Sequence, residues 1–147
     1  MKKIIYVFMV GCLPSFIYSC GKMDINGDLD GMWHLRMVED LPEGAITSVK
    51  EQCIYYSIQQ ELITVKRLYG SESREIYETH IGRFIHTRDS LILHNFRIFQ
   101  NEGIVGTSKS LAPFYLDGLT SRYAIKRLNT NEMILRSNQR ELTFKKF

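Results

Sequence analysis

The fold is decided by one alternating stretch of the chain, YETHIGRFIHTRDSLILHNF, residues 77–96. Apolar and polar residues alternate on both sides of Arg88-Asp89, and a period of two is typical of β-strands. A pairing of Thr87 with Ser90 predicts a hairpin of two antiparallel strands. One face is then expected to carry His80, Gly82, Phe84, His86, Leu91, Leu93 and Asn95, and the other Thr79, Ile81, Arg83, Ile85, Ile92 and His94.

Both faces of this hairpin hold apolar side chains. Ile81, Ile85 and Ile92 form an apolar stripe on the face that does not carry Phe84 and Leu93. Contiguous apolar patches are seldom left in water without a reason. We therefore expect the stripe to be covered by the following segment or by another chain.

The same period of two continues toward the start of the chain. After Gly31, apolar residues from Trp33 to Met37 alternate with their neighbours, which predicts a half-buried strand. The next apolar region, Gln52 to Tyr69, contains no Gly, Pro, Asn or Asp. It forms either one long bent strand or two strands that turn tightly near residues 59–61.

The end of the chain predicts a meander of three strands at residues 122–128, 133–136 and 142–147, because polar turns separate three alternating runs. Pairing across these turns sets Arg136 opposite Glu141, an exposed ion pair worth at most about 1 kcal/mol. One face of the meander collects Leu128, Met133, Leu135, Leu142 and Phe144.

The alternation lapses between Arg97 and Ser121. Glycines and serines indicate a loop, and residues Leu111 to Leu119, with Pro113 near the start, predict a short helical turn. A long irregular segment in a compact domain is often a lid or a binding loop. The alternative is a segment that crosses and plugs one end of the domain.

Seven or eight strands follow one another in residues 31–147, without an internal repeat or linker. Antiparallel meanders of this length protect their edges by closing into a barrel. The sequence therefore predicts an all-β, up-and-down antiparallel barrel of about eight strands with one short helical segment. A barrel of about eight strands is either filled by its side chains or holds one small ligand.

The N-terminus has the pattern of a secretory signal. Lys2 and Lys3 precede a short apolar run from Ile4 to Phe16. A membrane-spanning helix needs roughly 20 apolar residues, so this run is too short to cross a bilayer.

The signal ends in Ile17-Tyr18-Ser19-Cys20, which resembles the lipobox of bacterial lipoproteins, although Tyr18 departs from the commoner small residue. The resemblance implies cleavage after residues 1–19, lipidation of Cys20, and an acidic tether over residues 20–30. Because one acyl chain binds membranes only marginally, stable anchoring implies more than one chain. Outer-membrane localisation follows from the same resemblance, with the periplasmic and the cell-surface face both open.

Cysteine and charge counts exclude several classes of protein. Cys12 leaves with the signal and Cys20 is lipidated, so Cys53 has no partner for an intramolecular disulfide and is expected to be a small buried residue. Removal of Lys2 and Lys3 lowers the basic count from 19 to 17, against 16 acidic residues. The basic residues are scattered singly, so we expect no nucleic-acid binding.

No metal or catalytic motif emerges. Residues 24–31 resemble a calcium loop, but starting at Asn26 places Met37 where the bidentate Glu belongs, so a solvated tether and turn is favoured. His80 and His86 share a strand face but lie about 20 Å apart at roughly 3.4 Å per residue. We therefore expect no enzyme activity, no metal and no cofactor.

Five short segments carry a family likeness: Gly31-Met32-Trp33-His34-Leu35, Tyr55-Tyr56-Ser57-Ile58-Gln59, Gly82-Arg83-Phe84 with Asp89-Ser90-Leu91, and Leu142-Thr143-Phe144-Lys145-Lys146-Phe147. They resemble the lipocalin-like lipoproteins of Bacteroidota. Gly31 and Trp33 match the Gly-x-Trp pattern that packs at the closed end of lipocalin barrels. The resemblance implies an eight-stranded calycin-type barrel, possible binding of a small apolar molecule, and no catalytic activity.

Two hypotheses of function follow from a barrel of this kind. In the first, a small apolar ligand binds inside the barrel, since such pockets are mainly apolar. In the second, the barrel is filled and the stripe of Ile81, Ile85 and Ile92 binds a partner protein. The side chains expected inside, as ligand contacts or simply as core, are Trp33, Phe84, Leu93, Met133 and Phe144.

Overall fold

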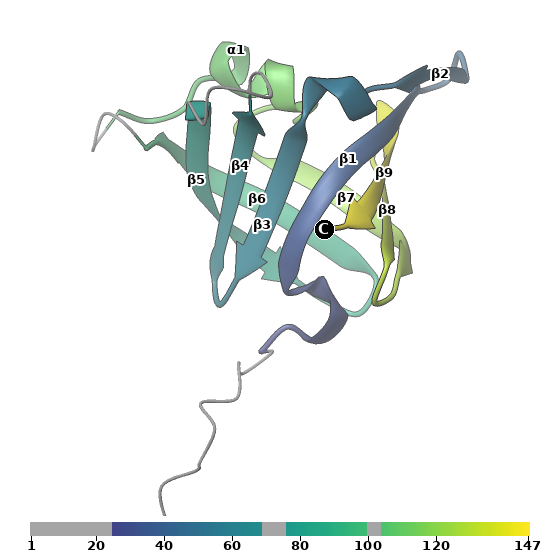
Figure 1. Ribbon diagram of the computed structural model, residues 1–147, viewed down its shortest axis with the longest axis horizontal. Helices are drawn as coiled ribbons and strands as arrows, with labels where there is room; N and C mark the ends of the chain where they lie inside the picture. Colours follow the sequence, from purple (N-terminus) through teal and green to yellow (C-terminus); the bar gives the residue numbers. More distant parts are fainter. Residues whose placement is uncertain (1–24, 69–75, 100–103) are drawn as a thin grey trace, which may run out of the picture.

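A computed structural model describes residues 25–68, 76–99 and 104–147 (Figure 1). The predicted signal, the lipidation site at Cys20 and the first part of the tether lie outside the described residues. Within those residues, no helix is long and apolar enough to cross a membrane.

The described chain forms nine strands, one short α-helix and three single-turn 3-10 helices. The strands are β1 (Gly31–Asp40), β2 (Ala45–Ser48), β3 (Ile54–Gln59), β4 (Leu62–Leu68), β5 (Ile76–His86), β6 (Ser90–Ile98), β7 (Ser121–Leu128), β8 (Glu132–Arg136) and β9 (Arg140–Lys146). The helices are η1 (Gly27–Leu29), η2 (Lys50–Gln52), α1 (Ser108–Leu111) and η3 (Ala112–Phe114).

Eight of these strands close into an antiparallel barrel, which confirms the predicted fold class. The order is β1-β3-β4-β5-β6-β7-β8-β9, and β9 pairs with β1 to complete the ring. The ninth strand, β2, pairs only with the second half of β1, whereas the first half of β1 pairs with β3. As a result β2 stands beside the ring (Figure 1).

The apolar region from Gln52 to Tyr69 forms two strands. β3 and β4 pair from Ile54 opposite Arg67 to Gln59 opposite Leu62. Gln60 makes the tight turn between them with a φ of 56°, in the left-handed region. This resolves the alternative in favour of a turn at the predicted place, without the glycine that usually occupies such positions.

The hairpin of β5 and β6 has the predicted turn, because the Thr87 amide donates to the Ser90 carbonyl at 2.9 Å. The register then shifts at a β-bulge between Ile81 and Arg83, and Asn95 on the opposite strand has a φ of 57°. Asn95 is exposed and Phe96 is 2% exposed. The expectation that Asn95 faces inward is therefore wrong, because the extra residue of the bulge turns Phe96 into the core.

Gly82 explains why the bulge is tolerated. A Cβ atom at this position would lie 2.7 Å from Cδ1 of Phe96, well inside van der Waals contact. The ring of Phe96 therefore occupies the space that a side chain at residue 82 would need. Glycine thus permits the close approach that the bulge produces.

The C-terminal meander has the predicted register. Met133 pairs with Phe144, Leu135 with Leu142, and Arg136 with Glu141. The Arg136–Glu141 ion pair spans 3.4 Å, and Leu128 is only partly buried. The other four apolar residues of the predicted face have no solvent exposure: Met133, Leu135, Leu142 and Phe144.

The interior of the barrel is packed with buried apolar side chains from seven strands of the ring and with the partly buried Phe84 from β5. The largest of them are at most 2% exposed, and they include five aromatic rings from five different strands and a sixth from η3. Such close packing is typical of a protein core. The largest buried side chains are Trp33, Tyr56, Tyr123, Phe96, Phe114 and Phe144.

One end of the barrel is closed by η1, and we call it the η1 end (Figure 1). Trp33 is fully buried there, and its Nε1 donates to the Leu29 carbonyl at 2.8 Å. The Lys146 ammonium lies 4.8 Å from the centre of the Trp33 ring and donates to the Asp28 carbonyl at 2.9 Å. Gly31, with a φ of 132°, leaves room for the Lys146 side chain.

Candidate functional site at the plugged end of the barrel

The end opposite η1 is covered by residues 108–116, which we call the plug (Figure 1). The plug contains α1 and η3, so the helical segment begins three residues before the predicted Leu111 and ends at Phe114. Thr107 and Ser110 form a reciprocal capping box at its start. Leu111 and Phe114 are fully buried. Of the two alternatives for this segment, the structure has the crossing segment that fills the barrel end.

Side chains of the barrel wall hold the plug through its backbone carbonyls. The Tyr56 hydroxyl donates to the Phe114 carbonyl at 2.6 Å, and the Tyr123 hydroxyl donates to the Tyr115 carbonyl at 3.4 Å. The Arg67 guanidinium donates to the Pro113 carbonyl at 2.9 Å. The last carbonyls of a helix have no partner within the helix, so these bonds satisfy groups that would otherwise be buried alone.

Burial keeps both tyrosine hydroxyls protonated. Desolvation raises the pKa of Tyr56 well above its usual range, and the charge of Asp117 adds to the effect. The pKa of Tyr123 is raised for the same first reason. Both groups are therefore hydrogen-bond donors over the whole physiological pH range, which is the role that the plug requires of them.

His80 is a buried polar side chain below the plug. It is 3% exposed, and its ring centre lies 5.3 Å from that of Phe114. A Cβ atom at Gly106 would lie 3.5 Å from its Cδ2, so the chain passes directly over the ring. Neither ring nitrogen of His80 has a hydrogen-bond partner among the described residues. The hydroxyl of Thr79, the preceding residue, has none there either.

Burial lowers the pKa of His80, and the charge of Glu78 opposes this effect. The imidazole is therefore neutral at physiological pH. Leaving a buried polar group unpaired costs about 1–3 kcal/mol, and such groups are rare unless they have a function. His80 thus supplies an unused donor and an unused acceptor in an otherwise apolar place.

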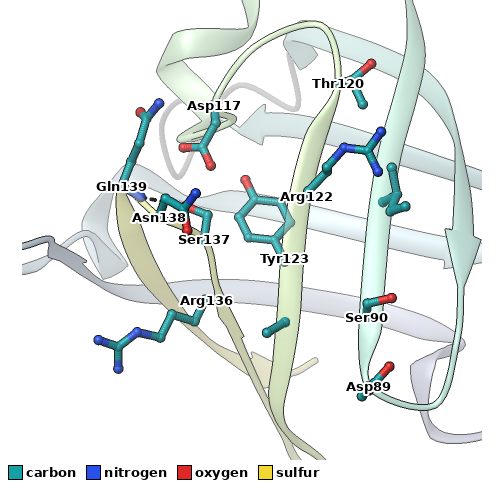
Figure 2. Close-up of a pocket in the computed structure, with 12 residues that line it drawn as sticks. Asp89, Ser90, Asp117, Thr120, Arg122, Tyr123, Arg136, Ser137, Asn138 and Gln139 are labelled. Carbon is teal, nitrogen blue, oxygen red and sulfur yellow. Dashed lines mark hydrogen bonds between the residues drawn. The ribbon is translucent and has the colours of Figure 1, made fainter.

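A groove of about 600 Å³ lies beside the plug, between the first half of β7 and the turn of residues 137–139 (Figure 2). We call this groove the seam. β7 pairs with β6 from Ser121 to Ala124 but joins β8 only from Ala124 onward. The first half of β7 therefore lacks a neighbour on its β8 side. Tyr123 lies between the two walls in Figure 2.

An ion pair lies at the inner end of the seam. Arg140 Nε is 3.2 Å from Asp117 Oδ1, and both side chains are largely buried. The Arg140 guanidinium also lies 5.9 Å from the centre of the Tyr115 ring. The seam is lined by Asp89, Ser90, Ile92, Asp117, Thr120, Arg122, Tyr123, Ala124, Arg136, Ser137, Asn138 and Gln139.

Comparison with known proteins identifies the family. The model of the lipocalin-like domain matches residues 15–147. The chain belongs to this lipocalin-like family. No curated protein matches it.

Two solved structures share the fold. A lipocalin-like protein from Bacteroides uniformis has 17% sequence identity and a TM-score of 0.62, over 82% of this chain and 100% of that protein. An uncharacterized protein from Bacteroides eggerthii has 19% identity and a TM-score of 0.61, over 80% of this chain and 98% of that protein. At these identities the likeness concerns the lipocalin-like fold alone.

The structure distributes the five predicted ligand contacts over the lipocalin-like barrel. Trp33, Leu93, Met133 and Phe144 have no solvent exposure and do not line the seam. Phe84 is only partly buried and lines a groove of about 420 Å³ at the η1 end. The sequence pattern placed these side chains on inner faces, but it could not show which of them touch a surface pocket.

Sequence reasoning missed the residues that hold the plug. Tyr56 appeared only within a short family motif, Tyr123 was not singled out, and His80 was considered only with His86 as a possible metal ligand. No local pattern links them, because they come from three different strands and their common partner, the plug, is 58 residues from Tyr56, 34 from His80 and 8 from Tyr123 in the chain. Within the described ranges, no group of three or more His, Cys, Asp or Glu residues could hold a metal ion.

The apolar stripe of Ile81, Ile85 and Ile92 and the side chain of Cys53 are more exposed to solvent than core residues are. Ile85 is 52% exposed, whereas Ile81 and Ile92 are partly buried. No described segment covers Ile85. Cys53 is a free thiol of intermediate burial with a φ of 50°, so it is less buried than predicted.

Proposed function

We propose that this lipocalin-like protein is a membrane-anchored, non-enzymatic binding protein for a small, mainly apolar molecule that enters at the plug end. The observation that carries the proposal is His80, a buried imidazole beneath the plug whose two nitrogens have no hydrogen-bond partner among the described residues. Displacement of the plug would leave a space with apolar walls and one polar group, the arrangement typical of small-molecule sites.

The ligand class follows from the groups around this space. Phe96 and Phe114 provide aromatic surface near His80, and the Tyr56 hydroxyl becomes an additional donor once the Phe114 carbonyl leaves it. We therefore expect an apolar molecule with one hydrogen-bonding group, such as a hydroxyl, carbonyl or carboxyl. Three polar bonds to its carbonyls hold the plug together with the buried side chains of Leu111 and Phe114, and a ligand that displaces it would have to offer acceptors and apolar surface of the same kind.

Membrane anchoring through Cys20 is the second part of the proposal. The lipobox-like Ile17-Tyr18-Ser19-Cys20 and the preceding apolar run support it. Acyl chains on Cys20 would hold the protein at the outer membrane, and the barrel would bind its ligand at that surface.

Native mass spectrometry tests ligand binding. The protein is extracted gently from the membrane of a bacterial host, and its mass is measured under native and denaturing conditions. We expect an adduct of small-molecule mass in the wild type, loss of the adduct on denaturation, and a much smaller adduct in His80→Phe. His94→Phe, on the outward face of β6, is the matched control and should keep the adduct.

A bare mass in the wild type would be followed by titration with N-phenyl-1-naphthylamine, a small apolar fluorophore. Absence of saturable binding, or equal adducts in His80→Phe and wild type, would refute the site below the plug.

A second function is favoured by the filled interior together with the half-exposed Ile85: a protein-interaction module that uses the stripe of Ile81, Ile85 and Ile92. A photo-crosslinking residue at Ile92 in living cells should then form a discrete protein adduct. If only uncrosslinked protein is recovered, this second function is wrong.

A further inference from the structure

Three of the exposed large apolar side chains lie at the η1 end of the barrel, whereas others, such as Phe99, Ile104 and Val105, lie elsewhere on the described surface. Ile25 is 62% exposed, Leu62 is 43% exposed and Ile85 is 52% exposed. Ile25 lines the same groove as Phe84, the neighbour of Ile85. Since Leu62 pairs with Arg83, two residues before Ile85, Leu62 and Ile85 are diagonal neighbours on the outer face. These three residues, which we call the apolar rim, come from three different elements.

The apolar rim lies at the end of the barrel where the chain enters from the predicted lipid anchor at Cys20. Cys20 precedes Ile25 by five residues, and five residues span at most about 18 Å even when fully extended. β5 alone has 11 residues and extends over roughly 36 Å at about 3.3 Å per residue. A lipid on Cys20 would therefore keep Ile25 within about 18 Å of the bilayer, which is about half the length of β5.

We propose that the η1 end lies directly on the membrane, with the apolar rim in the interfacial layer of the lipids and the plug end facing away. This inference rests on the anchoring part of the proposed function. It adds an orientation and a second membrane contact, which anchoring alone does not require.

The chemistry of the rim fits a lipid surface better than a protein pocket. The groove inside the rim is lined mainly by polar groups of Asn26, Gln60, Glu61 and His86, so it offers no deep apolar socket for a partner side chain. Of the three rim residues, Ile25 lines this groove, while Leu62 and Ile85 lie on the neighbouring outer face. Arg88 in the β5–β6 turn has no ion pair within the described part of the chain and can contact lipid phosphates.

Site-directed spin labelling of the lipidated, full-length protein tests the orientation. In a Cys53→Ser background, one cysteine is introduced by Ile85→Cys or Leu62→Cys, and the matched control is Ile46→Cys. Ile46 is 67% exposed and lies on β2, away from the η1 end (Figure 1). The labelled protein is reconstituted in vesicles of phosphatidylcholine and phosphatidylglycerol, and collision with oxygen and with a water-soluble nickel chelate is measured.

We expect labels at residues 85 and 62 to collide several-fold more with oxygen and several-fold less with the chelate than the label at residue 46. Vesicle-bound protein whose label at residue 85 meets the chelate as readily as the label at residue 46 would overturn the orientation and leave the anchor intact. Protein that stays in the aqueous phase would overturn both. Labels at residues 85 and 62 shielded from both reagents would overturn the lipid contact and indicate a protein partner on the rim.

Discussion

The β-bulge of the central hairpin can be tested with one methyl group. In Gly82→Ala, the new Cβ would lie 2.7 Å and 2.8 Å from two ring carbons of Phe96 and 3.0 Å from the His94 carbonyl oxygen. Favourable contacts between carbon atoms are at about 3.5–4.0 Å, so the ring must move by nearly 1 Å. Phe96 is 2% exposed, and the packed core leaves it little room to do so.

Overpacking of this kind destabilises a fold by about 1–3 kcal/mol. For a domain of this length, that corresponds to a melting temperature lower by roughly 5–15 °C. Urea and thermal unfolding followed by circular dichroism measure both quantities.

The double variant Gly82→Ala/Phe96→Leu serves as the control. A smaller side chain at residue 96 relieves the clash, so the double variant should be more stable than the sum of the two single changes predicts, by about 1 kcal/mol. If Gly82→Ala melts at the wild-type temperature, or if the two changes are additive, then Phe96 does not cover Gly82 and the register described here is wrong.

Three further predictions concern the plug, the pH dependence and the anchor. Tyr56→Phe leaves the Phe114 carbonyl buried without its donor and should lower the free energy of unfolding by about 1–3 kcal/mol; an unchanged urea midpoint would contradict the role of this bond. Burial lowers the pKa of His34 and His80 below the 6.5 of the unfolded chain. Below pH 6.5 the unfolded chain therefore binds more protons than the folded protein. The free energy of unfolding should fall as the pH drops through 6.5, and it should be fully retained above that pH. Urea midpoints between pH 5 and 8 measure this, and His80→Phe should flatten the acid side; an identical slope in that variant would refute the assignment. Cys20→Ala should move the protein from the membrane fraction to the soluble fraction, and unaltered retention would exclude lipid anchoring.

Much of the barrel can be predicted from the sequence, because successive side chains of a strand point to opposite faces of the sheet. A strand with one solvent-exposed and one buried face therefore alternates between polar and apolar residues. The turn at Arg88-Asp89 and the register of β8 and β9 follow from that pattern. β2 cannot be predicted from this pattern, because all four of its residues are exposed and polar and apolar residues need not alternate there. The bulge cannot be predicted from the alternation for a different reason. The additional residue at Asn95 has no distinctive sequence signal, but it exchanges the inward and outward positions of the residues that follow it on β6.

The candidate site is less predictable than the wall. His80 reads as an ordinary inward residue of a strand, and only the folded position of the plug shows that its nitrogens are unused. Tyr56 and Tyr123 are likewise indistinguishable in sequence from simple core aromatics, because their hydroxyl partners are backbone carbonyls, which carry no side-chain signature. The anchor at Cys20 remains a prediction, since it lies outside the described residues.

The chain contains one tryptophan, and this fact gives the closed end of the barrel an optical signature. The indole of Trp33 is shielded from water, bonded through its nitrogen and covered by the Lys146 ammonium. Its emission should therefore be blue-shifted in the folded protein. Trp33 is paired directly with Tyr56 on β3, and the Tyr56 hydroxyl holds the plug, so the indole lies one side chain away from the plug as well. Loss of the Lys146 contact and displacement of the plug should both alter the spectrum, and intrinsic fluorescence can thus follow changes at either end of the barrel without any added label.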